Sequence, residues 1–183
     1  MANVGLIAAG AGGVETIRAG LIAPLIDQGH QVAVTLTPTA ARWLLAIDEI
    51  EPIAQLTELP VRWESRLPGE QSQHPKIDLY IAAPLTATST AKLALGIGDN
   101  QALTTLCESI TTVPMIVFPR INAAHARQPS WSEHLARLRS VGVHLVYGAD
   151  VWPLAEPRAA GSRDLPWQAI LATIQTLVPQ SGS

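Results

Sequence analysis

The sequence predicts an α/β protein with a three-layer α/β/α, Rossmann-like (flavodoxin-like) fold built on a doubly wound parallel sheet. Short apolar runs typical of buried strands alternate along the chain with segments in which apolar residues recur at helical spacing. Three of these runs end in turns that carry glycine, hydroxyl, amide or cationic groups. Open parallel sheets bind ligands at the carboxyl ends of their strands, which is where such turns lie. We expect one domain that spans residues 1–183.

The first elements form a βαβ unit. The apolar run Val4–Ala9 breaks at the glycine-rich turn 10–13, and a pattern of helical spacing follows, which predicts a strand, a tight turn and a helix. A second strand is predicted at 31–36. Thr37 is placed as the N-cap of the next helix and Pro38 as its first residue.

The later elements alternate in the same way, after an irregular stretch. Residues 51–77 contain four prolines and a polar centre, so we expect one or two short strands and then a mobile loop. Further elements are predicted in this order: a strand at 79–82, helices within 87–110 that are interrupted near 96–99, a strand at 115–118, a helix at 131–139, a strand at 143–147 and a helix from 167 to 177.

Polar turns follow the third and fourth of these strands. Each turn would present side-chain donors and acceptors, together with the free N–H groups of a new helix, to a ligand at the same edge of the sheet. Trp131, Trp152 and Trp167 fall in segments that flank this edge. The candidate ligand-binding residues are Pro84, Thr86, Thr88 and Ser89 in the first turn and Arg120, Asn122 and His125 in the second.

The glycine turn differs from the dinucleotide fingerprint G-x-G-x-x-G. Gly10 and Gly12 fill the first two positions, but Glu15 occupies the third and would place a carboxylate near a pyrophosphate. NAD and NADP are therefore disfavoured, and a smaller ligand with a terminal phosphate fits better. The alternative is a glycine turn that binds no ligand. The residues expected around the phosphate are Gly10, Gly12, Gly13, Thr37 and Thr39.

These turns resemble those of the FMN-dependent flavoproteins that include the cysteine-type decarboxylases of lantibiotic and coenzyme A biosynthesis. Residues 84–89 are similar to the family's Pro-Ala-Ser-Ala-Asn-Thr turn, 92–100 to the helix that follows it, and 119–122 to the start of Pro-x-Met-Asn-x-x-Met-Trp. The resemblance implies FMN bound between the subunits of a homotrimer or a multiple of it. The loop at 66–70 and the tail from residue 152 look most like an actinobacterial branch of this group.

The chain departs from the family pattern at several positions. Thr88 stands where the family has an FMN-contacting Asn, and Ile121 where it has Met. The family's catalytic His lies about eight residues before the Asp that opens the third strand. In this chain that position is Glu70, whereas His74 is four residues before Asp78. The family's mechanism of cysteine decarboxylation is therefore in question.

The residues of the second turn are the candidates for catalysis. His125 follows Asn122 closely, and an imidazole titrates near physiological pH, so His125 is expected to donate or accept a proton. Asn122 and Arg120 are expected to hold the substrate. His74 is the weaker candidate for a base. No pair of histidines has a third ligand at metal-binding spacing, so we expect no metal site.

The function expected from these residues is that of an FMN-binding flavoprotein. It would catalyse a redox or oxidative decarboxylation step on a small carboxylate-bearing substrate. One alternative is a non-catalytic flavin-binding or regulatory subunit that has lost the family's catalytic His. Another is a pocket that holds no flavin, because Thr88 replaces the family's Asn.

Composition limits the partners and the setting. Charged residues make up 15% of the chain and apolar residues 48%, which favours burial of surface between subunits. The net charge of −3 and the lack of a Lys/Arg run give no reason to expect nucleic acid or an anionic membrane as a partner. Cys107 is the one cysteine, and we expect it to be buried and inert. With no signal-peptide pattern, a cytoplasmic protein is expected.

Overall fold

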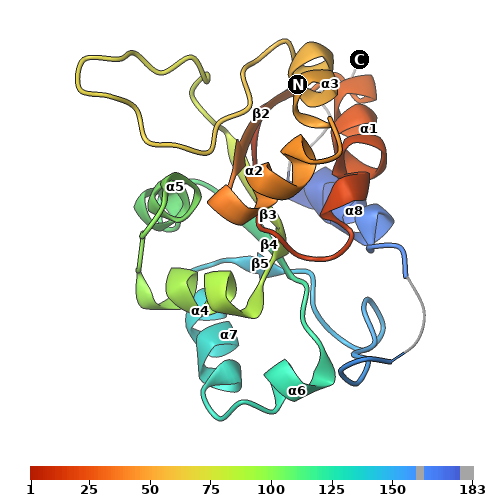
Figure 1. Ribbon diagram of the computed structural model, residues 1–183. Coiled ribbons are helices and arrows are strands. Elements are labelled where there is room, and N and C mark those ends of the chain that lie inside the picture. The colour runs from red at the N-terminus through yellow and green to blue at the C-terminus, as the bar shows by residue number, and fades with distance from the viewer. Residues whose placement is uncertain (160–162, 178–183) are drawn as a thin grey trace.

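The computed structural model describes residues 1–159 and 163–177 and contains a five-stranded sheet in which all pairs are parallel (Figure 1). The strand order is β2-β1-β3-β4-β5, the order of flavodoxin-like folds, so the predicted fold class is confirmed. The strands are β1 (Asn3–Ala8), β2 (Gln31–Leu36), β3 (Leu79–Leu85), β4 (Met115–Pro119) and β5 (His144–Leu145). The helical segments are η1 (Val14–Thr16), η2 (Arg18–Ile22), α1 (Ala23–Asp27), α2 (Pro38–Leu45), α3 (Ile50–Thr57), α4 (Ala87–Leu95), α5 (Gln101–Ser109), α6 (Ala123–Ala126), α7 (Trp131–Ser140) and α8 (Trp167–Leu177).

Helices cover both faces of the sheet, with α1, α3 and α8 on one side and α4, α5 and α7 on the other (Figure 1). Successive side chains of a strand point to opposite faces. Leu6 and Ala8 of β1 therefore belong to the apolar core under α1 and α8, whereas Ile7 belongs to the core under α4 and α5. Burial on both faces explains why the strands appear in the sequence as continuous apolar runs.

The segment from residue 50 to 78 differs from the prediction. Its first part is helix α3, in which Ile53 is fully buried, and not a strand. Pro52 lies in the first turn of α3, where a backbone N–H has no acceptor within the helix, so the proline breaks no hydrogen bond. Arg62 forms one isolated parallel bridge to Thr35, and residues 58–78 otherwise carry no strand pairing. The expectation of one or two strands here is wrong, because a helix tolerates proline in its first turn.

Two strand ends also differ from the prediction. β3 continues to Leu85, and its register with β4 shifts between Ala82 and Leu85, which then pairs with Pro119. The hydroxyl-rich turn therefore begins at Thr86. At the edge of the sheet, β5 is limited to two residues, His144 and Leu145.

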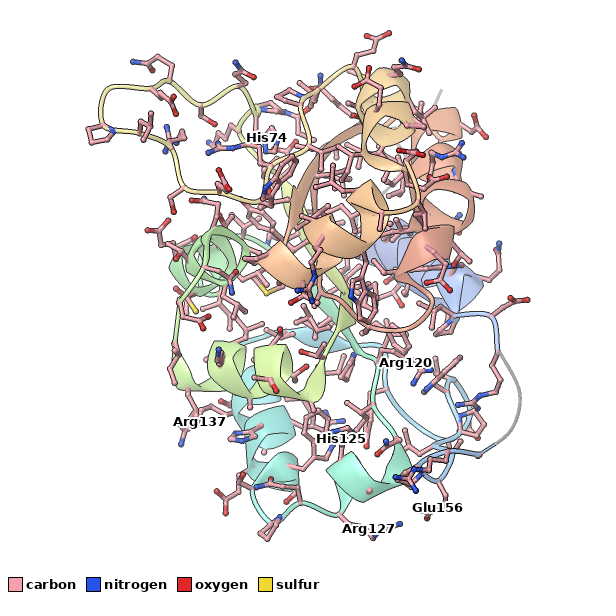
Figure 2. All side chains as sticks on the ribbon, in the orientation of Figure 1. His74, Arg120, His125, Arg127, Arg137 and Glu156 are labelled. Atoms are coloured by element: carbon pink, nitrogen blue, oxygen red, sulfur yellow. The ribbon has the colours of Figure 1, made fainter. Side chains whose placement is uncertain are left out.

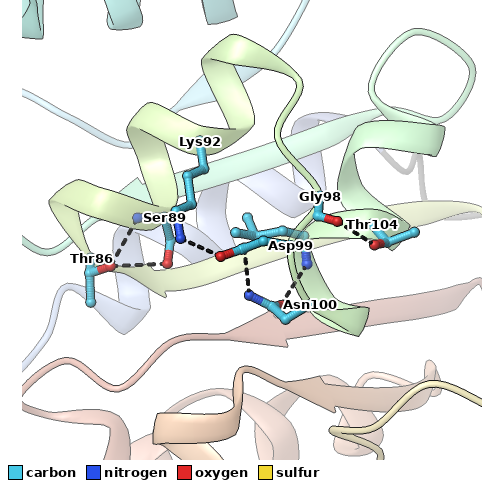
Figure 3. A network of polar contacts seen from close by, with 8 residues as sticks. Thr86, Ser89, Lys92, Gly98, Asp99, Asn100 and Thr104 are labelled. Atoms are coloured by element: carbon cyan, nitrogen blue, oxygen red, sulfur yellow. Dashed lines mark hydrogen bonds and ion pairs between the residues drawn. The ribbon is translucent and has the colours of Figure 1, made fainter.

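A polar network closes the connection between α4 and α5 (Figure 3). Gly96 ends α4 with a positive φ of 71°, a conformation that glycine adopts without strain. Lys92 of α4 pairs with Asp99, and Asn100 caps α5 by accepting a hydrogen bond from the N–H of Leu103 at 3.1 Å. The Thr104 hydroxyl donates to the Gly98 carbonyl at 3.1 Å. The predicted interruption near 96–99 is confirmed, and the network orients the start of α5.

Replacing Asn100 with alanine is expected to lower the free energy of unfolding by about 1 kcal/mol, because the Leu103 N–H loses its capping acceptor. Asn100→Asp keeps an acceptor oxygen and should lose much less. Urea unfolding followed by circular dichroism measures both. Equal losses in the two variants would mean that the cap contributes little.

No helix within residues 1–159 and 163–177 combines the length and the apolar character that a bilayer crossing requires. Burial raises the pKa of the half-buried Cys107 thiol, and the nearby Glu108 raises it further. A raised pKa disfavours the nucleophilic thiolate, in agreement with the expectation of an inert thiol.

Candidate functional site

Backbone hydrogen bonds join the predicted turns into one continuous edge, here called the carboxyl rim, which comprises residues 9–13, 37–39, 84–89 and 119–122. The Thr37 N–H donates to the Ala8 carbonyl at 2.9 Å, and the Ala9 N–H donates to the Pro84 carbonyl at 2.8 Å. The Arg120 N–H donates to the Leu85 carbonyl at 2.8 Å. Each bond ties the turn after one strand to the end of its neighbour, so the sheet brings the turns together as expected.

A pocket of about 310 Å³ opens at one end of this rim. Gly12 and Gly13 of the glycine turn form one wall, and Arg120, Ile121 and Asn122 form another. The remaining wall comes from residues 155–159 and 163–165. The pocket therefore unites four predicted site residues, namely Gly12, Gly13, Arg120 and Asn122.

Two contacts hold the outer wall of the pocket against α6. The Ala123 N–H donates to the Ala155 carbonyl at 2.9 Å. Arg127 forms a bidentate ion pair with Glu156, with N···O distances of 2.6 and 2.9 Å, and Figure 2 shows the two side chains together near α6. The pair is exposed, so it contributes little to stability, but its two parallel hydrogen bonds fix the position of Glu156.

Arg120 is the most unusual side chain of the pocket. Its Nε atom is buried and has no hydrogen-bond partner among the described residues, and its guanidinium carbon lies 5.3 Å from the centre of the Trp152 ring. Burial lowers the pKa of Arg120, the nearby Arg163 lowers it further, and Glu15 raises it. No carboxylate in the described part of the chain forms an ion pair with Arg120. A guanidinium in this setting favours an anionic ligand.

The glycine turn is open to this pocket at Gly12. A Cβ atom built on Gly12 would meet only the Arg120 Nη2 atom, at 3.7 Å, whereas one on Gly13 would lie 2.5 Å from Leu165. Gly13 also has a positive φ of 98°, so this position requires glycine. Its N–H already bonds to the Glu15 carboxylate at 3.0 Å, while the Gly12 N–H has no partner among the described residues. Gly12 therefore presents the free backbone donor.

The predicted hydroxyl groups lie outside the pocket, and several of them cap helices. Thr37 accepts a hydrogen bond from the Ala40 N–H, and Thr86 accepts one from the Ser89 N–H at 3.0 Å. Thr86 also donates to the buried Ser89 hydroxyl. Thr88 is exposed and makes no hydrogen bond within the described residues.

Thr39 and Pro84 complete the predicted set on the rim. The Thr39 side chain packs where a Cβ on Gly10 would lie, so Gly10 permits a close approach between the first and second turns. Pro84 is buried, and its carbonyl is occupied by the Ala9 N–H. These two residues shape the rim and do not line the pocket.

The structure separates His125 from Arg120 and Asn122, the other two residues of the second turn that are predicted to act in catalysis. Asn122 accepts a hydrogen bond from the His125 N–H at 3.0 Å and thereby caps α6. The amide nitrogen of Asn122 remains available beside the pocket. The His125 side chain is exposed and does not line the pocket, so within one chain it has no enclosed surroundings in which to handle a proton.

His74 lies away from Arg120, in the upper part of the view in Figure 2, and does not line the pocket. Its Nε2 atom is 2.8 Å from the Pro60 carbonyl, and burial lowers its pKa. It lines a second cavity, of about 150 Å³, against residues of β1 and β2. A neutral imidazole donating to a carbonyl is a structural arrangement, and it does not bring His74 to the pocket.

The residues that sequence reasoning missed come from the segment at 152–165. Arg163 lies over the Trp152 ring at 3.9 Å and lines the pocket together with Arg158. The position of Trp152 near the predicted edge was the only sequence signal for this wall. Within the described residues, no three His, Cys, Asp or Glu side chains gather as possible metal ligands.

Two curated proteins are similar to part of this chain. A cysteine/cysteine sulfinic acid decarboxylase from an unknown prokaryotic organism is 33% identical over 69 residues, which are 38% of this chain and 19% of that protein. The coenzyme A biosynthesis bifunctional protein CoaBC of Thermococcus kodakarensis is 28% identical over 80 residues, which are 44% and 19% of the two chains. The matches span about a fifth of the length of these relatives.

Solved structures share the fold over nearly the whole chain. The FMN-dependent cysteine decarboxylase SpaF superposes with a TM-score of 0.67 at 18% identity, covering 97% of this chain and 98% of that one. The FMN binding protein AtHal3 has a TM-score of 0.65 at 19% identity, with coverage of 100% and 99%.

The family comparison covers almost all of the sequence. The description Flavoprotein matches residues 1–178, which confirms the family predicted from the turns, while the actinobacterial branch stays a prediction. On this match, and with the sheet order and carboxyl rim described above, the chain belongs to the Flavoprotein family.

Proposed function

We propose that this chain binds FMN on the carboxyl rim and uses it in a redox or oxidative decarboxylation step on a small carboxylate-bearing substrate. The observation that carries the proposal is the pocket in which an open glycine turn faces a guanidinium without an anionic partner. Family membership supports the flavin, and SpaF and AtHal3 are described as FMN proteins. The substrate class rests on Arg120 and Asn122, whose donor groups line the pocket and suit a carboxylate.

The rim fits the parts of FMN. The free N–H of Gly12 would hold the phosphate, as backbone N–H groups at the N-termini of helices commonly do. The hydroxyls of Thr37 and Thr39 lie on the rim outside the pocket and would approach the phosphate from the turn that follows β2. The turn from Pro84 to Ser89 would contact the ring system, with Thr88 as the free hydroxyl. When bound, the flavin supplies an acceptor for an electron pair.

The chain's own residues would bind and orient the substrate. The Arg120 guanidinium, which is half-buried and lines the pocket, would pair with the substrate carboxylate. The free amide nitrogen of Asn122 would donate a second hydrogen bond, while its oxygen keeps α6 capped. His125 would exchange a proton with the substrate only if a neighbouring subunit covers α6, because its side chain is exposed in the single chain.

The proposal is tested on the purified protein. The protein should be yellow, and mass spectrometry of the small molecule released on denaturation should identify FMN and not FAD. Anaerobic addition of a substrate should bleach the visible flavin band. A colourless protein that does not take up added FMN would refute the proposal.

The structure also favours a second candidate, a non-catalytic flavin-binding or regulatory subunit. His74 is bound to the Pro60 carbonyl and lies away from the pocket, and His125 is exposed. Under this alternative the purified protein is still yellow, but no small carboxylic acid bleaches it.

A trimeric building block is predicted, in which the segment 96–100 approaches the flavin of a neighbour. Exposed apolar side chains support a subunit contact. Ile97 of this segment is 45% exposed, Leu95 at the end of α4 is 49% exposed, and Leu45 on α2 is 50% exposed. Sedimentation at micromolar concentration should show no stable monomer. A monodisperse monomer loaded with flavin would contradict the prediction.

A further inference from the structure

The pocket contains a second arginine that the proposed function leaves without a role. The guanidinium carbon of Arg163 lies 3.9 Å from the centre of the Trp152 ring, and that of Arg120 lies 5.3 Å from the same centre. The two cations are therefore held on one indole, and the presence of Arg163 lowers the pKa of Arg120. Neither arginine forms an ion pair with a carboxylate of the described residues.

Two buried donors beside these cations have no acceptor within the described residues. They are the Nε atom of Arg120 and the Nε1 atom of Trp152. A buried N–H without an acceptor costs free energy. Arg120 lines the pocket and Trp152 does not, so an oxyanion bound there would offset the cost at the Arg120 Nε atom. The repulsion between the two guanidinium groups would fall at the same time.

The carboxylates of the pocket offset these two charges only in part. Glu156 is paired with Arg127, whereas Glu15 accepts the hydrogen bond from the Gly13 N–H, keeps its charge and raises the pKa of Arg120. Asp164 and Arg163 are both exposed, so water screens both charges. The Arg163 guanidinium is held in place by a hydrogen bond from its Nη1 atom to the Pro153 carbonyl at 2.6 Å. The exposed Arg158 adds a further positive charge to the wall.

We propose that Arg120 and Arg163, both held on Trp152, form a specificity site for a doubly negative oxyanion group. The inference rests on the proposed function, because it names the class of substrate for the same pocket. The pocket selects substrates with two negative charges over simple monocarboxylates. Two sources share this chemistry, namely a dicarboxylate and a phosphate monoester, and the latter includes the phosphate of FMN.

The experiment follows Trp152 fluorescence while malonate, inorganic phosphate or acetate is added at constant ionic strength. Malonate or phosphate should bind at least about tenfold more tightly than acetate, because the second charge gains its own charge-assisted hydrogen bonds. Trp152→Phe should remove the signal, which assigns it to this ring. Because flavin is not needed for this readout, the apoprotein can be tested even if the chain binds no FMN.

Two variants decide the role of the second arginine. Arg163→Gln should abolish the preference for dianions while leaving acetate binding unchanged. Arg137→Gln is the matched control, since Arg137 is an exposed arginine on α7 and lies away from Arg120 in Figure 2. Equal affinity for malonate and acetate, or a preference that survives Arg163→Gln, would overturn the proposal.

The source of the dianion is decided by repeating the titration on FMN-loaded protein. Phosphate that displaces FMN would assign the site to the flavin phosphate. Malonate or phosphate that binds without displacing FMN would assign it to the substrate. The first result would overturn the proposal of a substrate site, and the second result, together with the preference over acetate, supports it.

Discussion

Replacing Gly12 with phenylalanine is expected to give a folded but colourless protein. A Cβ at this position meets only the Arg120 Nη2 atom at 3.7 Å, so the fold tolerates a side chain there. The phenyl ring would nevertheless fill the space in front of the free Gly12 N–H. Flavin affinity should fall at least about a hundredfold, because charge-assisted hydrogen bonds to the phosphate, each worth roughly 1.5–3 kcal/mol, are lost. The flavin-to-protein ratio after gel filtration measures the effect.

Two neighbouring variants show whether that loss is local. Gly12→Ala adds only a methyl group at an ordinary contact distance and should keep much of the flavin. Gly13→Ala should destabilise the protein, because its φ is positive and the new Cβ would lie 2.5 Å from Leu165. A Gly12→Phe protein that retains full flavin occupancy would show that the phosphate does not lie at this turn.

The second large effect concerns catalysis. If the protein is an enzyme in which a neighbouring subunit covers α6, His125→Ala should lower turnover by about 10²–10⁴ with flavin still bound, as expected for the loss of a positioned acid or base. His74→Ala should change turnover little, because His74 donates to the Pro60 carbonyl and lies away from the pocket. The ratio of turnover to bound flavin, measured under anaerobic conditions, compares the variants directly.

Asn122 requires a substitution that respects its structural role. Asn122→Ala would remove both the cap of α6 and the free amide, so its effect on turnover would be ambiguous. Asn122→Asp keeps an oxygen for the His125 N–H, but it replaces the amide donor with a negative charge beside the substrate carboxylate. A large loss of turnover with unchanged stability identifies Asn122 as a substrate ligand. Loss of turnover in His74→Ala alone would instead move the base to the loop at 58–78.

The sequence predicted the strands and most helices because both faces of a central parallel sheet are buried. Runs such as 115–118 in β4 carry that signal locally, and the caps at Thr37 and Asn100 mark helix starts through their own side chains. Prediction from the sequence failed at α3, because Pro52 lies in the first turn of that helix, where proline is tolerated. The sequence also predicted the end of β3 too early. The last residues of β3 belong to the strand because Leu85 pairs with Pro119 of β4, and this shifted pairing depends on the neighbouring strand.

By itself, the sequence determined the order of elements outside the segment from residue 50 to 78, the polar turns at the strand ends and the family to which those turns belong. Which side chains share a pocket was decided only by the tertiary structure. Gly12 and Arg120 meet there because parallel strands bring all their carboxyl ends to one edge. The stacking of Arg163 on Trp152 depends on how the chain returns after β5, and no local pattern encodes that path. His125 follows Asn122 closely in sequence, yet the cap that Asn122 forms leaves the imidazole exposed.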